Sequence, residues 1–151
     1  MTDIRRPVPR PSPETTEFWE ACRQERFQMP QCRDCGSFWF PPSAFCPQCW
    51  SLHWDWREAS GSGQLHTFVI FRRQYHPAFP TPYALGVAQL EEGPRVLGRI
   101  LTDGLDRLHV GLQVKLVWDH TGEWNIPAFQ PVYDSGIEEP KVMGILKKLS
   151  G

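Results

Sequence analysis

Four cysteines in the first third of the chain are the residues whose types and spacing most directly indicate chemistry. Cys32 and Cys35 form one Cys-x2-Cys pair, and Cys46 and Cys49 form a second pair after ten intervening residues. Each pair makes a tight turn that presents two thiolates in one direction, and two pairs supply the four tetrahedral ligands that zinc prefers. Four protein ligands leave no open coordination position, so we expect a structural zinc, Zn2+, with no catalytic role. Iron in a rubredoxin-like site would have the same geometry.

The remaining sequence offers no pattern of catalytic residues. The five histidines show no ligand spacing, and no Gly-x-Ser-x-Gly, P-loop or Gly-x-Gly-x2-Gly motif occurs. The fifth cysteine, Cys22, is expected to be a small buried hydrophobic residue on a helix. We therefore predict no catalytic residue and no activity of the chain alone. A His–Asp pair brought together by the fold stays an alternative.

Composition and charge restrict the class of protein. The 151 residues include 7 Trp and 9 Phe, which indicates a folded globule, and the 15 Pro and 12 Gly favour short strands and turns. A net charge of −1 argues against a nucleic-acid-binding protein. The sequence contains no secretory signal and no apolar run of the roughly 20 residues that span a bilayer. Paired Cys-x2-Cys motifs suit a reducing compartment, so we expect a cytoplasmic protein with no membrane contact.

The N-terminal segment is predicted to be an arm followed by a helix. Residues 1–11 are rich in Pro and Arg and form an extended arm, and Ser12 and Pro13 are typical of the first positions of a helix that ends near Gln24. One face of this helix is apolar. We favour packing of that face on the domain itself, and docking onto a partner is the alternative. The face consists of Phe18, Trp19 and Cys22.

The rest of the chain is predicted to contain the zinc ribbon and then a small barrel. Within the ribbon, residues 36–45 are expected to form a short hairpin that joins the two cysteine pairs. Gly86 and Gly98 are expected to mark bulges that let a small sheet curl. Five strands with one short helical link at residues 103–108 match a five-stranded OB-fold barrel. The predicted strands are residues 65–72, 83–90, 96–101, 113–119 and 124–129. The predicted divisions are 1–26 for the arm and helix, 27–59 for the ribbon, 60–132 for the barrel and 133–151 for a C-terminal tail.

The order of these pieces resembles the zinc-ribbon and OB-fold proteins grouped as domain of unknown function family 35. The matching pieces are Phe18-Trp19, residues 32–36 (CRDCG), 40–42 (FPP), 45–49 (FCPQC), 61–68 (GSGQLHTF), 82–85 (PYAL) and 90–95 (LEEGPR). The resemblance covers roughly residues 13–132. It implies a small accessory subunit, in a hetero-oligomer with a thiolase-, acyltransferase- or aldolase-type enzyme, that helps to hold acyl-CoA. The catalytic residues would then belong to the partner.

The implied acyl-CoA or partner contact directs attention to one loop and a few arginines. The loop at residues 74–82 (QYHPAFPTP) is aromatic and proline-rich and lies where OB folds take ligands. It forms either a wall for an acyl chain or partner, or a cap on the barrel. Arginines on the sheet would hold the CoA phosphates, or else lie on a solvated face and pair with Glu91 and Glu92. The candidates are Tyr75, His76, Phe79, Arg72, Arg95 and Arg99.

The C-terminal tail carries a second candidate docking surface. Its apolar residues recur with helical spacing, and a helix of about eleven residues needs burial against something to be stable. We favour docking of this tail onto the partner enzyme over packing on the barrel. The apolar positions are Val142, Met143, Ile145, Leu146 and Leu149. Two other functions remain open at this stage: an OB-fold protein that binds single-stranded nucleic acid, and a stand-alone enzyme acting on acyl-CoA.

Overall fold

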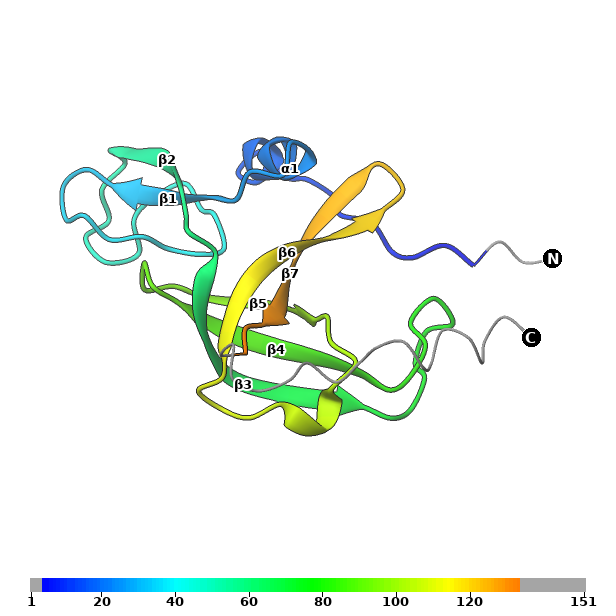
Figure 1. Ribbon diagram of the computed structural model, residues 1–151. Helices are drawn as coiled ribbons and strands as arrows, with labels where there is room; N and C mark the ends of the chain where they lie inside the picture. Colours follow the sequence, from blue (N-terminus) through cyan, green and yellow to red (C-terminus); the bar gives the residue numbers. More distant parts are fainter. Residues whose placement is uncertain (1–3, 134–151) are drawn as a thin grey trace, which may run out of the picture.

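The computed structural model of the protein describes residues 4–133, which contain one α-helix, one short 3-10 helix and seven strands (Figure 1). The predicted tail positions Val142, Met143, Ile145, Leu146 and Leu149 lie outside the described residues. In residues 4–133, no helix is long and apolar enough to cross a membrane. The elements in chain order are α1 (Thr16–Arg23), β1 (Gln28–Cys32), β2 (Trp54–Glu58), β3 (Ser62–Phe71), β4 (Tyr83–Leu90), β5 (Arg95–Ile100), η1 (Leu105–Arg107), β6 (Gln113–Thr121) and β7 (Trp124–Pro131).

Strands β3 to β7 form a closed barrel in the order β3-β4-β5-β7-β6, and β6 pairs back with β3. The β5–β7 pair is parallel, at Ile100 and Phe129, and the other pairs are antiparallel. This order, with η1 as the link between β5 and β6, is that of a five-stranded Greek-key OB barrel. The predicted fold class is confirmed.

The barrel interior is filled by large side chains from four strands and kept narrow by small residues on the fifth. Leu65, Val96, Val114 and Phe129 are each 2% exposed or less. Strand β4 alternates between buried and half-buried positions, and its inward positions hold small residues before the strand ends on a leucine. These inward residues are Ala84, Gly86, Ala88 and Leu90.

The two glycines expected to mark bulges have another role. Gly86 pairs directly with Gly98 across β4 and β5, with no irregularity there. A Cβ atom would lie 2.7 Å from Leu65 Cδ1 at Gly86 and 3.1 Å from Phe129 Cδ2 at Gly98, so both glycines make room for core side chains. The bulge of this sheet lies in β3, between Leu65 and Thr67.

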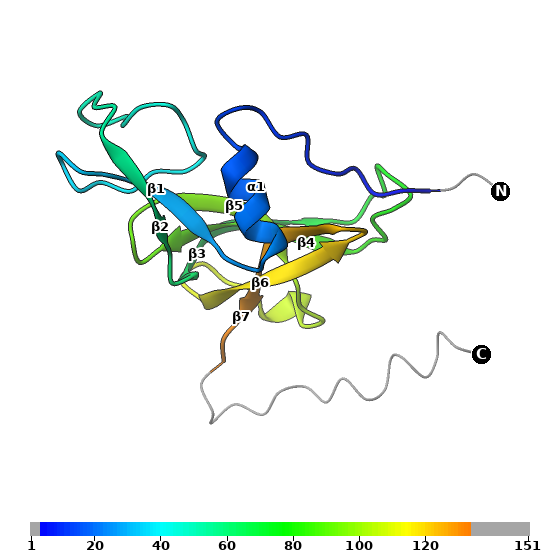
Figure 2. The same cartoon turned by 90° about the horizontal axis from the view of Figure 1, so that it is seen from above.

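Helix α1 lies over the barrel and beside the ribbon, contacting β7 and β1 (Figure 2). The helix begins at Thr16, later than predicted, because Ser12 and Pro13 belong to a preceding turn in which the Ser12 carbonyl accepts hydrogen bonds from the N–H groups of Thr15 and Thr16. Cys22 is fully buried, as predicted, and this burial raises the pKa of its thiol to about 12.

The apolar face of α1 packs on the protein itself. Phe18 is 3% exposed, and its ring meets those of Phe27 and Phe40 at centroid distances of 6.0 and 5.5 Å. Trp19 is half-buried and its ring meets the edge of Trp124 on β7 at 6.0 Å. The favoured alternative for this face is therefore the one observed, and Phe18 has no ring surface left for docking.

The ribbon is held together by two strands at its ends. β1 ends on Cys32, the first of the four cysteines, β2 follows the second cysteine pair, and the two strands pair antiparallel from Gln28–Glu58 to Cys32–Trp54. The hairpin expected within residues 36–45 does not form, because this segment extends as a loop with one isolated bridge between Gln31 and Phe38. A loop suits the Pro41-Pro42 pair, which has no N–H groups for a ladder.

Candidate functional site

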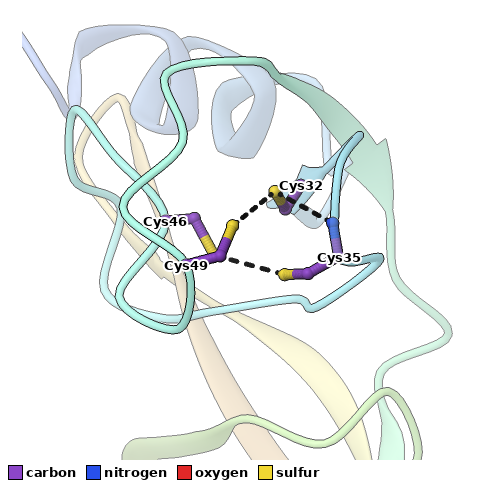
Figure 3. Close-up of side chains that lie close together, drawn as sticks. All are labelled: Cys32, Cys35, Cys46 and Cys49. Atoms are coloured by element: carbon purple, nitrogen blue, oxygen red, sulfur yellow. Dashed lines mark hydrogen bonds between the residues drawn. The ribbon is translucent and has the colours of Figure 1, made fainter.

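The four cysteines form a compact cluster at one end of the ribbon (Figure 3). Their sulfur atoms all lie within 4.8 Å of one another, with 3.6 Å between Cys32 and Cys49 and 3.6 Å between Cys35 and Cys46. A tetrahedral zinc with bonds of about 2.3 Å places its sulfur ligands about 3.8 Å apart. The four thiolates therefore fit zinc, and they fill its coordination sphere.

The two cysteine pairs repeat the same turn with an offset of fourteen residues. The N–H of Gly36 donates to the Cys32 carbonyl at 3.1 Å, and the N–H of Trp50 donates to the Cys46 carbonyl at 2.9 Å. Gly36 has φ +76° and Trp50 has φ +65°, a left-handed conformation that favours glycine. Trp50 is 73% exposed and stacks on the ring of Phe45 at 5.3 Å. Each of the two similar turns directs two thiolates toward the same point. For this reason the spacing of the cysteines alone predicts the site.

Hydrogen bonds lower the pKa of two of these thiols, and the neighbouring sulfurs raise the pKa of a third. The N–H of Cys35 lowers the pKa of Cys32, and the hydroxyl and N–H of Ser37 lower the pKa of Cys35 to about 6. The N–H of Ser51 lowers the pKa of Cys49, but the neighbouring sulfurs together have the larger effect and raise this pKa to about 12. The cluster therefore retains a proton on Cys49. A divalent cation replaces the protons that the cluster shares, so metal binding weakens as the pH falls.

A His–Asp pair, the alternative left open by the sequence, lies beside the cysteines. It does not have the geometry of a catalytic nucleophile and base. His53 Nδ1 lies 3.3 Å from Asp34 Oδ2, and the Ser51 hydroxyl hydrogen-bonds to the same carboxylate. A catalytic serine would have to hydrogen-bond to the histidine ring, whereas the Ser51 hydroxyl accepts a bond from the backbone N–H of His53 at 2.9 Å. Here the serine and the exposed histidine both contact the aspartate, so the arrangement stabilises the second cysteine turn.

The aromatic residues of the loop at residues 74–82 pack on one another at one end of β3 and β4. The ring of Tyr83 stacks on Phe71 at 5.0 Å, and Phe79 lies 6.0 Å from Tyr83 and 5.7 Å from His76. His76 Nδ1 accepts a hydrogen bond from the N–H of Ala78, which fixes the turn. Tyr75 is 70% exposed at the edge of this aromatic group.

Of the three predicted arginines, Arg99 lies at this loop and Arg72 and Arg95 do not. Arg99 lies over the Phe79 and Tyr83 rings at 5.6 and 5.9 Å, whereas Arg95 donates to the side chain of Gln89 and Arg72 is exposed. Of the six predicted contact residues, the structure thus groups Tyr75, His76, Phe79 and Arg99. Glu91 and Glu92, expected to pair with the arginines, contact Ser60 instead.

Two residues that the sequence did not single out complete the charge network at this loop. Asp119 accepts a two-pronged pair of hydrogen bonds from Arg6 at 2.9 and 2.8 Å, and a third from Arg99 at 2.9 Å. Arg6 also lies 5.1 Å from the centre of the Phe79 ring. No local signal in the sequence links Arg6 to Asp119, because 113 residues separate them.

Replacing Asp119 with Asn should lower the free energy of unfolding by about 1–2 kcal/mol at pH 7, since two half-buried guanidinium groups lose their counter-charge. Burial raises the pKa of Asp119, but the hydrogen bonds from Arg6 and Arg99 outweigh it and hold the pKa below its usual range. The stabilisation is therefore complete above the ordinary carboxyl pKa of about 4 and is lost as the pH falls through the lower pKa of the folded state.

The measurement is urea unfolding of the parent and variant proteins between pH 7 and pH 3. The difference between them should shrink toward the acid end. Asp103→Asn, which removes the same charge from an exposed position, is the matched control and should have little effect. A constant difference at all pH values would show that the ion network is not its source.

Comparison with known proteins places this arrangement in a class that joins a zinc ribbon to an OB-fold barrel. Residues 19–55 match the family described as ChsH2, rubredoxin-like zinc ribbon domain, and residues 56–119 match ChsH2, C-terminal OB-fold domain. A solved chain of the Ltp2-ChsH2(DUF35) aldolase superposes with a TM-score of 0.76 and 31% sequence identity, covering 82% of this chain and 98% of that chain. The protein belongs to the ChsH2/DUF35 family, and its four cysteines form the structural zinc site of that family's ribbon.

Two curated relatives extend the comparison. A probable enoyl-CoA hydratase alpha subunit from Thermomonospora curvata is 32% identical over 127 residues, which is 83% of this chain and 40% of the relative. A DUF35 domain-containing scaffold protein from Methanocaldococcus jannaschii is 28% identical over 96 residues, which is 58% of this chain and 64% of the relative. This chain thus spans about two fifths of the hydratase subunit and about two thirds of the scaffold protein.

Proposed function

We propose that the protein is a non-catalytic accessory subunit that binds a thiolase-like enzyme and helps to hold its acyl-CoA substrate. The observation that carries this proposal is the similarity to a chain of the Ltp2-ChsH2(DUF35) aldolase over 98% of that chain. The name of that structure joins the DUF35 protein to a second protein. The hydratase relative supports a CoA ester as the substrate class.

The chemistry of the described residues is consistent with this role. The cluster of four thiolates leaves zinc no position for water or a thioester oxygen. Within residues 4–133, Cys22 is buried with a raised pKa, and Ser51 bonds to the backbone N–H of His53 and to Asp34 but not to the His53 ring. A subunit with these features contributes structure and binding, and its partner contributes the reacting groups.

The test is co-expression of the tagged chain with a thiolase-like protein encoded beside it in the genome. We expect the two proteins to co-purify in a fixed ratio through size-exclusion chromatography, and we expect acyl-CoA turnover only when both are present. A hydratase-like neighbour, expressed in the same way, serves as the comparison partner. A chain that stays alone with every thiolase-like neighbour, or that turns over acyl-CoA by itself, would refute the proposal.

A further inference from the structure

A cleft of about 920 Å³ lies between the N-terminal arm and the tip of the β6–β7 hairpin. In Figure 1 the arm runs past this hairpin on the side of the molecule away from the ribbon. The arm contributes Arg5, Arg6 and Arg10 to the cleft, and the hairpin contributes His120, Glu123 and Trp124. The zinc site and the predicted sheet arginines are not part of it.

Arg6 anchors the arm that forms one wall of the cleft. Its guanidinium makes both hydrogen bonds to the Asp119 carboxylate, and Phe79 lies under it at 5.1 Å. The Nε–H of Arg6 is buried and has no acceptor within the described part of the chain. The anchor therefore fixes the arm on the barrel and leaves one donor of its guanidinium unsatisfied.

The cleft has an excess of positive charge. Apart from Arg5, the arginines Arg6 and Arg10 line it against one acid, Glu123, which already lies 3.9 Å from Arg23. Asp119 is shared by Arg6 and Arg99, so this group of three also carries a net positive charge. Arg10 makes no hydrogen bond or ion pair within residues 4–133 and is exposed. In a chain with a net charge of −1, this excess is a local property of the cleft.

Size and lining fit a small phosphorylated ligand. A volume of this order matches the sites that proteins use for cofactor-sized molecules. Arginine binds phosphate oxygens with two parallel N–H groups. Trp124 gives the cleft an aromatic wall, and the guanidinium of Arg23, 4.4 Å from the ring centre, holds that wall in place.

We propose that this cleft binds the phosphate groups of a small phosphorylated ligand, of the kind found at the nucleotide end of CoA. The proposal rests on the proposed function for the choice of CoA, whereas the phosphate chemistry follows from the cleft itself. The CoA phosphates would then contact arginines of the arm, in place of Arg72 and Arg95 on the sheet.

The test is calorimetric titration of the zinc-loaded full chain with CoA, adenosine 3′,5′-bisphosphate, inorganic phosphate and unphosphorylated adenosine. We expect binding of CoA and of the bisphosphate, weaker binding of inorganic phosphate and none of adenosine. Affinity should fall several-fold between about 50 mM and about 200 mM salt, as for exposed charge contacts. Similar affinities for inorganic phosphate and the bisphosphate would refute a nucleotide-sized site.

Arg10→Ala should weaken bisphosphate binding about threefold to fivefold, the range for one exposed charge contact. Because Arg10 has no partner in the described residues, this variant should fold normally, and its unfolding curve checks that. Arg57→Ala, an exposed arginine on β2, is the matched control and should bind like the parent. Arg6→Ala should weaken binding more strongly, because it removes a charge and releases the arm.

Three further results would overturn the inference: no bisphosphate binding at millimolar concentration, equal binding by Arg10→Ala and the parent, or much tighter binding of an oligonucleotide. None of these results would affect co-purification with the enzyme partner. Conversely, a cleft that binds the bisphosphate in a chain that recruits no partner would refute the proposed function alone.

Discussion

Removal of zinc should unfold the ribbon at residues 28–58 and weaken the packing of α1, while the β3–β7 barrel keeps its strands. Met29 packs into the main core, but around the zinc ligands the ribbon has little more than Trp39, with Trp54 packed against it. Zinc binding contributes on the order of 10–16 kcal/mol in zinc-finger peptides, and a short ribbon has no comparable source of stability. Loss of the metal should also expose Phe40, which packs against Phe18 of α1.

Tryptophan fluorescence and hydrogen exchange can follow this change as a chelator is added. Within the ribbon Trp39 is buried and Trp54 and Trp56 are half-buried, so the emission should shift to the red as they become exposed. Cys46→Ser should abolish the one zinc ion per chain that elemental analysis measures, whereas Cys22→Ala should retain it. Protons compete with zinc for the same sulfurs, so zinc affinity should fall continuously as the pH drops, and more steeply below the Cys35 pKa of about 6, where that thiol is protonated as well. Unchanged exchange in residues 28–58 after complete metal removal would contradict a structural role.

The second large effect is expected at the seam where the barrel closes. Gly63 pairs with Leu90 of β4 on one side and with Val114 of β6 on the other. A Cβ atom at Gly63 would lie directly against the carbonyl oxygen of Gln89, 2.9 Å from its carbonyl carbon and 3.0 Å from the Leu90 Cα. These atoms belong to the backbone of β4, so the clash cannot be relieved by a side-chain rotation.

We therefore expect Gly63→Ala to lower the free energy of unfolding by about 3 kcal/mol or more, the upper end of the range for overpacking. For a chain of this size the thermal midpoint should fall by roughly 6–12 °C, as differential scanning calorimetry would measure. Gly104→Ala is the matched control, because its Cβ would meet only side-chain atoms at ordinary contact distances, Arg107 Cδ at 3.4 Å and Thr102 Oγ1 at 3.7 Å, and its φ of −94° suits alanine. Equal thermal midpoints for the two variants would contradict this prediction, because they would show that the β4 backbone moves to accommodate the added methyl group.

Local patterns in the sequence were sufficient for the metal site and for most of the barrel. A Cys-x2-Cys turn presents its two sulfurs through its own hydrogen bonds, so the ligand set can be predicted without any long-range contact. The barrel strands follow from runs of β-branched and aromatic residues between turns, and each lies within a few residues of its predicted position. The ribbon strands β1 and β2 were missed because Pro30 and the charged residues around Trp56 hide their pairing.

The sequence by itself thus determined the four zinc-binding cysteines and the class of fold, because the cysteine turns and the succession of strands and turns are local patterns. Only the tertiary structure decided the partner of Arg99, the role of Gly86 and Gly98 as spaces for core side chains, and the position of the arm. Arg6 and Asp119 meet across 113 residues through the curvature of a closed barrel, and no local pattern encodes that distance. The basic cleft exists for the same reason: its two walls come from opposite ends of the described chain.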